Sequence, residues 1–154
     1  MNSRFTLAVH MLGLISYHQT QRGEPATSEQ MADSINTNPV VVRRILGDLR
    51  EANLVETRRG VGGGVRLARK PETITLRHVY EAVDQDCELI ALHPNPPSQS
   101  CMVGAHIEGF LREVFGEAEE ALKQRLAAVT VADLNLELAR RSARCMQDVG
   151  QQMA

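Results

Sequence analysis

The feature that most constrains the fold is a glycine-rich stretch, VETRRGVGGGVRLARK, at residues 55–70. Four of the five residues from 60 to 64 are glycine, and short apolar-polar alternations lie on both sides of them. Glycine supplies the positive φ that a tight turn needs, and alternation with a period of two is typical of strands. The stretch therefore predicts a β-hairpin, with residues 54–56 leading into the turn and residues 65–67 leading out of it.

A glycine-rich loop can also cradle the phosphate of a nucleotide, but the residues that follow this one do not fit. A P-loop continues with Lys, then Ser or Thr, and then a helix, and a dinucleotide-binding turn spaces its glycines G-x-G-x-x-G before a helix. Here Val65, Arg66 and Leu67 follow the glycines in the pattern of a strand. The β-hairpin is the better interpretation, and its basic tip then needs a partner other than a small nucleotide.

Charge is distributed unevenly along the chain. Residues 39–70 hold eight Lys or Arg and three acids, a local charge of +5; the whole chain is −2, so the remainder is −7. Because exposed charges are screened beyond about 10 Å, the local sign matters more than the total. A solvated basic face without a partner would also produce such a run. The elements predicted around residues 39–70 are therefore needed to distinguish a binding surface from an ordinary solvated face.

Three helices are predicted before the hairpin. The first covers RFTLAVHMLGLISYH, whose apolar residues recur at helical spacing, and His10 is expected to pack in the core among them. After a break, TSEQMADSI forms a short helix capped by Thr27 or Ser28. A second break, NTN, leads into PVVVRRILGDLREA, with Asn38 as N-cap and Pro39 at the first position.

A short helix, a tight break and a second helix with a basic outer face form a helix-turn-helix, to which the hairpin adds a wing. The expected fold class is mainly α with a small β-hairpin wing, followed by a long dimerisation helix. The second helix fits the major groove of double-stranded DNA, where Arg can donate two hydrogen bonds to guanine, and the basic tip fits a narrow minor groove. The expected DNA-binding residues are Thr37, Asn38, Val40, Arg43, Arg44, Arg58, Arg59, Gly62, Gly63, Gly64 and Arg66.

The rest of the chain predicts an elongated second part. HPNPPSQS suits neither a helix nor a strand interior, and from Cys101 an apolar stripe continues for about seven helical turns. One small domain cannot bury such a stripe, so pairing with a second copy is expected, through Val103, Ile107, Leu111, Val114, Ala118, Leu122 and Leu126. The predicted parts are a winged helix-turn-helix domain at 1–86, a loop at 87–100, dimerisation helices at 101–145 and a frayed tail at 146–154.

The run NPVVVRRILGDLREANLVETRRGVGGGVRLARKPETITLRHVYEAVD resembles the Rrf-two family of bacterial transcription regulators, and LHPNPPSQSCMVGAHI resembles its YwnA-like subgroup. The Arg before G-x-G-G-G is the most specific mark. The resemblance implies a homodimer, usually a repressor, on a near-palindromic operator, with Arg59 in the minor groove. It also implies base contacts from Val40, Arg43 and Arg44. Arg43 and Arg44 stand where another member of the family has acidic and amide side chains, so the resemblance does not imply that this chain binds the operator sequence of that member.

The three cysteines bear on what the regulator senses. The resemblance implies that iron–sulfur members carry three cysteines close together in the loop before the long helix, whereas here Cys87 and Cys101 flank that loop and Cys145 is distant. Two thiolates are too few for a cluster, so no metal or cofactor is expected unless His93, His106 or Cys145 of a second copy completes a set; an iron–sulfur-sensing regulator is kept as an alternative.

Two interpretations of the cysteines stay open. All three can be ordinary packed residues. Alternatively, Ser98 or Ser100 caps the long helix, so that Cys101 lies in its first turn, where the pKa of a thiol is lowered. Cys101, with Cys87 as a second candidate, would then respond to an oxidant or an electrophile, and a small-molecule effector is also compatible with the chain.

Other functions find little support in the sequence. The chain has no catalytic Ser-His-Asp context, no C-x-x-C pair and no H-E-x-x-H, so no enzyme is expected. No apolar run approaches the ~20 residues of a membrane span, no export signal is seen, and a cytoplasmic protein is expected. Histidines 18, 78, 93 and 106 are expected at the surface. An adaptor that uses the winged helix to bind protein remains an alternative, and it predicts no salt-sensitive binding to DNA.

Overall fold

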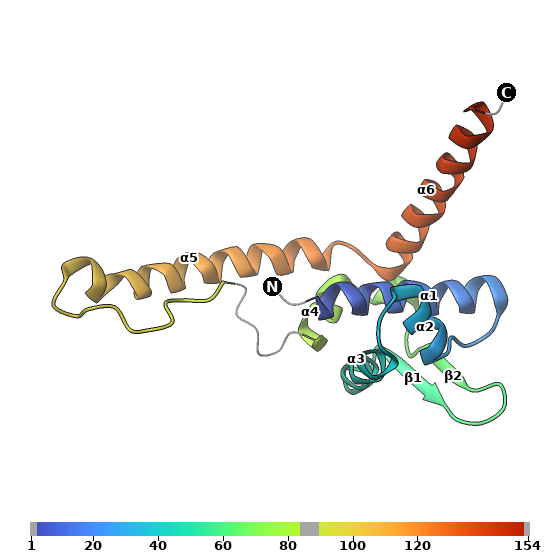
Figure 1. The fold of residues 1–154 in the computed structure, drawn as a ribbon, viewed down its shortest axis with the longest axis horizontal. Helices are drawn as coiled ribbons and strands as arrows, with labels where there is room; N and C mark the ends of the chain where they lie inside the picture. The colour runs from blue at the N-terminus through green and yellow to red at the C-terminus, as the bar shows by residue number, and fades with distance from the viewer. Residues whose placement is uncertain (1–2, 84–89, 153–154) are drawn as a thin grey trace.

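The chain folds into a winged helix-turn-helix body from which two long helices extend (Figure 1). The computed structural model describes residues 3–83 and 90–152, the last eight of these by their backbone alone. The elements are α1 (Arg4–Arg22), α2 (Ser28–Ile35), α3 (Pro39–Glu51), β1 (Val55–Arg58), β2 (Gly64–Leu67), the 3-10 turn η1 (Pro71–Thr73), α4 (Leu76–Val83), α5 (Met102–Ala127) and α6 (Val131–Gln152). The expected fold class, mainly α with a hairpin wing, is confirmed.

Helix α1 is the central element of the body. It packs against α2, α3, α4, α6 and β2, and it buries Met11, Ile15 and His18, which share one face at helical spacing. The expectation that His18 lies at the surface is therefore wrong. His10 was expected in the core but is exposed, with its Nε2 3.1 Å from Ser34 Oγ. Both errors have the same cause, because α1 is covered on several sides and its buried face cannot be read from one stripe.

The two helices of the helix-turn-helix begin where the sequence predicts. Thr27 caps α2, and its hydroxyl accepts a hydrogen bond from Gln30 N at 3.2 Å while Gln30 Oε1 accepts one from Thr27 N at 2.9 Å. Asn38 caps α3, with Oδ1 accepting from Val40 N at 2.8 Å, and Pro39 occupies the first helical position. Each cap satisfies backbone donors that the helix itself cannot pair. The two caps therefore fix where α2 and α3 begin.

The hairpin is anchored to the body at its root. β1 and β2 pair antiparallel, with Arg58 opposite Gly64. The connector between α1 and α2 pairs with β2 as well, because Ala26 and Val65 exchange two backbone hydrogen bonds of 3.1 and 2.8 Å. The side chain of Gln19 accepts a hydrogen bond from Leu67 N at 2.7 Å. The strands are thereby held against α1, while the tip projects beyond them.

Glycine is required where the wing turns. A Cβ on Gly63 would lie 2.7 Å from the carbonyl oxygen of Gly60 and closer still to that of Arg58. Gly64 has a φ of 144°, and a Cβ there would lie 2.8 Å from the carbonyl oxygen of Ala26. In both cases the nearest obstructing atom belongs to the backbone and cannot move aside as a flexible side chain would.

The long helices leave the body in different directions (Figure 1). No residue of α5 is buried. Its second half packs against α4, where Arg77 Nη1 lies 3.6 Å from Glu120 Oε1. α6 begins with the buried Val131 and continues to Gln152, whereas the sequence predicted a helical end near 145 and a frayed tail at 146–154. Among the described residues, no helix is both long and apolar enough to cross a membrane.

Candidate nucleic-acid interface

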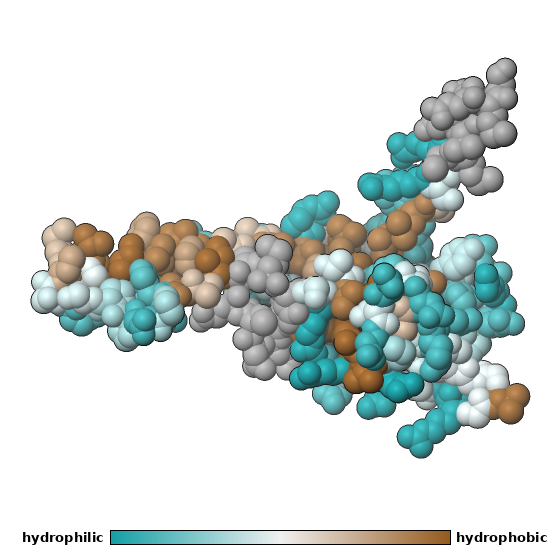
Figure 2. Space-filling model, in the orientation of Figure 1, coloured by the Kyte–Doolittle hydropathy of each residue, from teal (hydrophilic) through white to brown (hydrophobic). Residues whose placement is uncertain are grey.

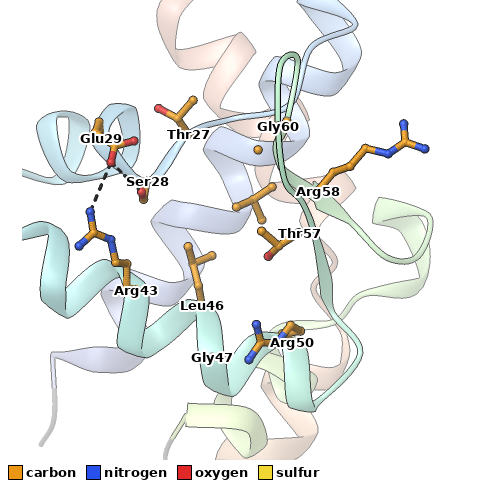
Figure 3. Close-up of a pocket in the computed structure, with 13 residues that line it drawn as sticks. Thr27, Ser28, Glu29, Arg43, Leu46, Gly47, Arg50, Thr57, Arg58 and Gly60 are labelled. Atoms are coloured by element: carbon orange, nitrogen blue, oxygen red, sulfur yellow. Dashed lines mark hydrogen bonds and ion pairs between the residues drawn. The ribbon is translucent and has the colours of Figure 1, made fainter.

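A surface groove lies between the start of α2, the outer face of α3 and the wing (Figure 3). Its volume is about 410 Å³. The residues that line it are Thr27, Ser28, Glu29, Arg43, Leu46, Gly47, Arg50, Thr57, Arg58, Gly60, Gly63, Gly64 and Val65. Three of them are arginines, which come from α3 and from the end of β1, so the groove combines two elements that are separate in the sequence.

Helix α3 has a buried face and an exposed face. Its apolar residues Val42, Ile45, Leu46 and Leu49 are buried against the rest of the body. Val40 is 65% exposed although it is apolar, and Arg43 and Arg44 are exposed beside it. The predicted reading residues of α3 are thus directed away from the core, as a helix that enters a major groove requires.

The predicted wing residues have different surroundings. Arg58 lines the groove, and its side chain extends outward from the wing (Figure 3). Arg59 is exposed at the tip and does not line the groove. Arg66 is placed at the root, where its Nη2 donates a hydrogen bond to the carbonyl oxygen of Gly23 at 3.0 Å. The exposed arginines of the tip are therefore Arg58 and Arg59, while Arg66 holds the wing to the end of α1.

Several groove residues were not among the predicted DNA-binding positions. They are Thr27, Ser28, Glu29, Leu46, Gly47, Arg50, Thr57, Gly60 and Val65. Arg50 and Gly47 could have been found, because they follow Arg43 at helical spacings of seven and four and so share its face. No sequence signal points to Glu29, since its place in the groove depends on how α2 packs against α3.

Cys101 has a different position from the one predicted. It is itself the N-cap of α5 rather than a residue of the first turn. The hydroxyls of Ser98 and Ser100, the predicted caps, lie 2.9 Å from each other instead. The thiol of Cys101 is exposed, and the backbone N–H groups of Gly104 and, after it, Val103 hold the pKa of this thiol below its ordinary value.

The described residues do not assemble a metal site. Within them, no three His, Cys, Asp or Glu side chains lie close enough to hold a metal ion. His93 Nδ1 is 4.0 Å from Glu108 Oε1, and Cys101 is not part of such a set. Cys87 and the side chain of Cys145 lie outside the described residues. The expectation that the chain carries no iron–sulfur cluster therefore stays a prediction.

Helix α5 exposes an apolar face along its length, visible as hydrophobic residues in Figure 2. Val103 is 59% exposed, Phe110 61% and Val114 41%, and Ala118 continues the same line. The other four predicted interface residues are half-buried within the single chain: Ile107, Leu111, Leu122 and Leu126. The apolar face is thus wider than a single stripe, and none of the described residues of the same chain buries its outward half.

Comparison with known proteins agrees with this architecture. Residues 1–136 match the Rrf2 family, described as iron-dependent transcriptional regulators. YwnA of Bacillus subtilis strain 168, named as an HTH-type transcriptional regulator, is 41% identical over 134 residues, which is 87% of this chain and 96% of YwnA. A crystal structure described as that of a DNA-binding protein is 35% identical with a TM-score of 0.65, covering 85% of this chain and 97% of that one.

A more distant neighbour shares the fold alone. CymR, the global cysteine regulator of B. subtilis, is 18% identical, with a TM-score of 0.66 over 89% of this chain and 96% of CymR. The resemblance noted in the sequence is confirmed by the match over residues 1–136. The chain belongs to the Rrf2 family of DNA-binding transcription regulators.

Proposed function

We propose that the protein is a cytoplasmic, homodimeric repressor, without catalytic activity, that binds a near-palindromic operator through two copies of the groove surface. The observation that carries the proposal is the groove itself, which is lined by Arg43 and Arg50 of α3 and by Arg58 of the wing. In this proposal the exposed side chains of α3 contact base edges in the major groove, and the wing tip enters the adjacent minor groove.

The arginines have separate roles in this proposal. Arg43 and Arg44 lie on the exposed face of α3 and donate to guanine edges in the major groove, where a bidentate contact separates one base pair from the others. Arg59, at the exposed tip of the wing, enters the minor groove, where readout distinguishes little beyond A·T from G·C. Glycines at the tip let the backbone approach the phosphates.

Replacing these arginines tests the proposal. Arg43→Ala or Arg44→Ala should cost ~1–3 kcal/mol of operator binding and relax the preference for a G at one position in each half-site. Arg59→Ala should weaken binding and reduce the preference for A·T at one step of the half-site. Titrations against a duplex selected by the parent protein from random-sequence DNA, and against its scrambled version, at two salt concentrations, would measure both effects.

The matched control is Arg140→Ala, which removes the same charge from the exposed side of α6. It should leave both affinities close to those of the parent. If Arg59→Ala binds the selected duplex as tightly as the parent, the hairpin is not a DNA-reading wing. If the parent shows no salt-dependent binding to any duplex, the adaptor alternative, in which the groove binds protein, is favoured instead.

Dimerisation supplies the two-fold symmetry of the operator. The outward apolar face of α5, with Phe110 and Val114, is the surface that a second copy would cover. A symmetric dimer presents two α3 helices, and its half-sites should lie one helical turn of DNA apart, about 34 Å, or a multiple of it.

We also propose that Cys101 responds to oxidants or electrophiles. The support is its exposure at the N-cap of α5 together with the two backbone N–H groups that favour the thiolate. With hydrogen peroxide, the thiolate sulfur attacks one oxygen, the O–O bond breaks, hydroxide leaves, and the sulfur becomes a sulfenic acid.

The pH dependence of alkylation checks this response. Because the folded-state pKa of Cys101 is lowered, its thiolate should be populated at lower pH than in the unfolded chain. The rate of Cys101 modification by iodoacetamide should therefore rise at lower pH in the native protein than in guanidinium chloride, as measured by mass spectrometry of the Cys101 peptide. The same midpoint in both states would contradict an activated thiol.

A further inference from the structure

An acidic side chain lies in the groove that is proposed to receive DNA. Glu29 belongs to the first turn of α2, and its Oε1 lies 3.5 Å from Arg43 Nη2 of α3 (Figure 3). The hydroxyl of Ser28 donates a hydrogen bond to the same oxygen at 3.1 Å. The ion pair joins the two helices of the helix-turn-helix across the edge of the groove.

The pair contributes little to the stability of the free protein. The side chains of Arg43 and Glu29 are 61% and 65% exposed, and ion pairs in water at such exposure have a median contribution close to zero. A duplex seated in the groove would displace that water, and the attraction between the two charges then strengthens. Its influence is therefore expected in the complex with DNA rather than in the fold.

The geometry leaves Arg43 free to donate to a base. A guanidinium has five N–H donors in a planar fork, and Glu29 contacts Arg43 through one nitrogen, Nη2. A contact of this kind restricts the rotamers of a long side chain. Restriction before binding lowers the entropy that is lost when the side chain is ordered on its target.

Glu29 also changes how the groove meets a phosphate. The start of a helix is a favourable place for an anion, and here the carboxylate of Glu29, a residue of the first turn of α2, already lies there. Its own backbone N–H is the main cause that lowers the pKa of the Glu29 carboxyl, and Ser28 adds to the effect. A DNA phosphate that approaches this end of α2 is therefore opposed by a negative charge.

From these contacts we infer that Glu29 is a positioning residue that sets the base specificity of the regulator by holding Arg43 toward a guanine, at a cost in affinity for the DNA backbone. The inference rests on the proposed operator binding. It assigns the discrimination between DNA sequences to a residue outside the recognition helix α3. It also separates two quantities: the ratio of the affinities for operator and scrambled duplex, which depends on Arg43, and the affinity for DNA of any sequence, which depends on the charge of Glu29.

Glu29→Gln tests both quantities while keeping the size of the side chain. The probes are the duplex that the parent selects from random-sequence DNA and its scrambled version. Affinity for the scrambled duplex should rise, and the slope of log K against log salt should steepen by about one unit. The operator-to-scrambled ratio should fall by about fivefold or more, the lower end of what one base contact contributes. Glu72→Gln, an equal change of charge in η1, should change neither.

A double-mutant cycle with Arg43→Ala shows whether Glu29 acts through Arg43. In the Arg43→Ala background, Glu29→Gln should no longer lower the ratio, whereas the affinity for the scrambled duplex should still rise. The inference fails, and the proposed function stands, if Glu29→Gln lowers the operator-to-scrambled ratio equally in the parent and in the Arg43→Ala background. The same conclusion follows if Arg43→Ala lowers the ratio of the parent but Glu29→Gln leaves it unchanged. If the parent does not discriminate between the duplexes, the proposed function itself fails. Thermal unfolding of each variant confirms that the fold is intact.

Discussion

A negative charge at position 114 should convert the proposed dimer into a monomer and abolish tight operator binding. Val114 is apolar, 41% exposed in the single chain, and lies on the outward face of α5. In the proposed dimer, Val114→Glu would bury an unpaired carboxylate, which costs several kcal/mol. A cost of ~3 kcal/mol already raises the dissociation constant of the dimer by about a hundredfold. Sedimentation over a range of protein concentrations measures the effect.

The control for this variant lies on the same helix. Gln124 is already polar and exposed, so Gln124→Glu adds the same charge and should leave the dimer intact. Operator titrations of both proteins then connect assembly to DNA binding, because a monomer contacts only one half-site. If Val114→Glu sediments as the parent does, the interface does not use this face of α5.

Alanine at position 63 should remove most of the operator affinity while the core stays folded. The added Cβ would lie 2.7 Å from the carbonyl oxygen of Gly60, and the carbonyl oxygen of Arg58 is closer still. The tip must therefore change its backbone path, and that change displaces Arg58 and Arg59 together. We expect at least a tenfold loss of affinity for the selected duplex in Gly63→Ala, because even one lost base contact costs ~1–3 kcal/mol.

A second glycine in the chain provides the comparison. A Cβ on Gly116 meets no atom of the described residues within 4 Å, and alanine is a better helix former than glycine by ~1 kcal/mol. Gly116→Ala should therefore leave DNA binding unchanged and raise the thermal unfolding temperature slightly. Gly63→Ala should leave that temperature close to the parent value, because Gly63 lies in the projecting turn between β1 and β2. An unaltered operator affinity in Gly63→Ala would show that the tip makes no important contact.

The sequence predicts well wherever the determining interactions are local. Thr27 and Asn38 cap their helices through backbone groups only two or three residues away, so the residue type and the following helical pattern are sufficient. The hairpin follows from its glycines and the alternation around them, and its register pairs Val55 with Leu67 as an uninterrupted ladder. These elements define the helix-turn-helix and the wing, and with them the side of the molecule where DNA would bind.

Prediction is weaker where a residue depends on contacts from distant segments. His18 is buried because α1 is surrounded by several elements, which one apolar stripe does not reveal. The cap of α5 is an exception among the local features, because Cys101 occupies it although serine is the better capping residue, and the hydroxyls of Ser98 and Ser100 lie 2.9 Å from each other. The contact between Glu29 and Arg43 spans fourteen residues and exists only once α2 and α3 are packed together.

The division of α3 into two independent faces has a consequence for how such regulators diversify. Val42, Ile45 and Leu49 maintain the core, whereas Val40 and Arg44 are exposed. Surface substitutions of this kind usually change stability by no more than ~0.5 kcal/mol. After a gene duplication, one copy could therefore exchange its exposed residues and acquire new target promoters, without any of the intermediate sequences failing to fold. The two descendants would then regulate different genes while sharing one fold.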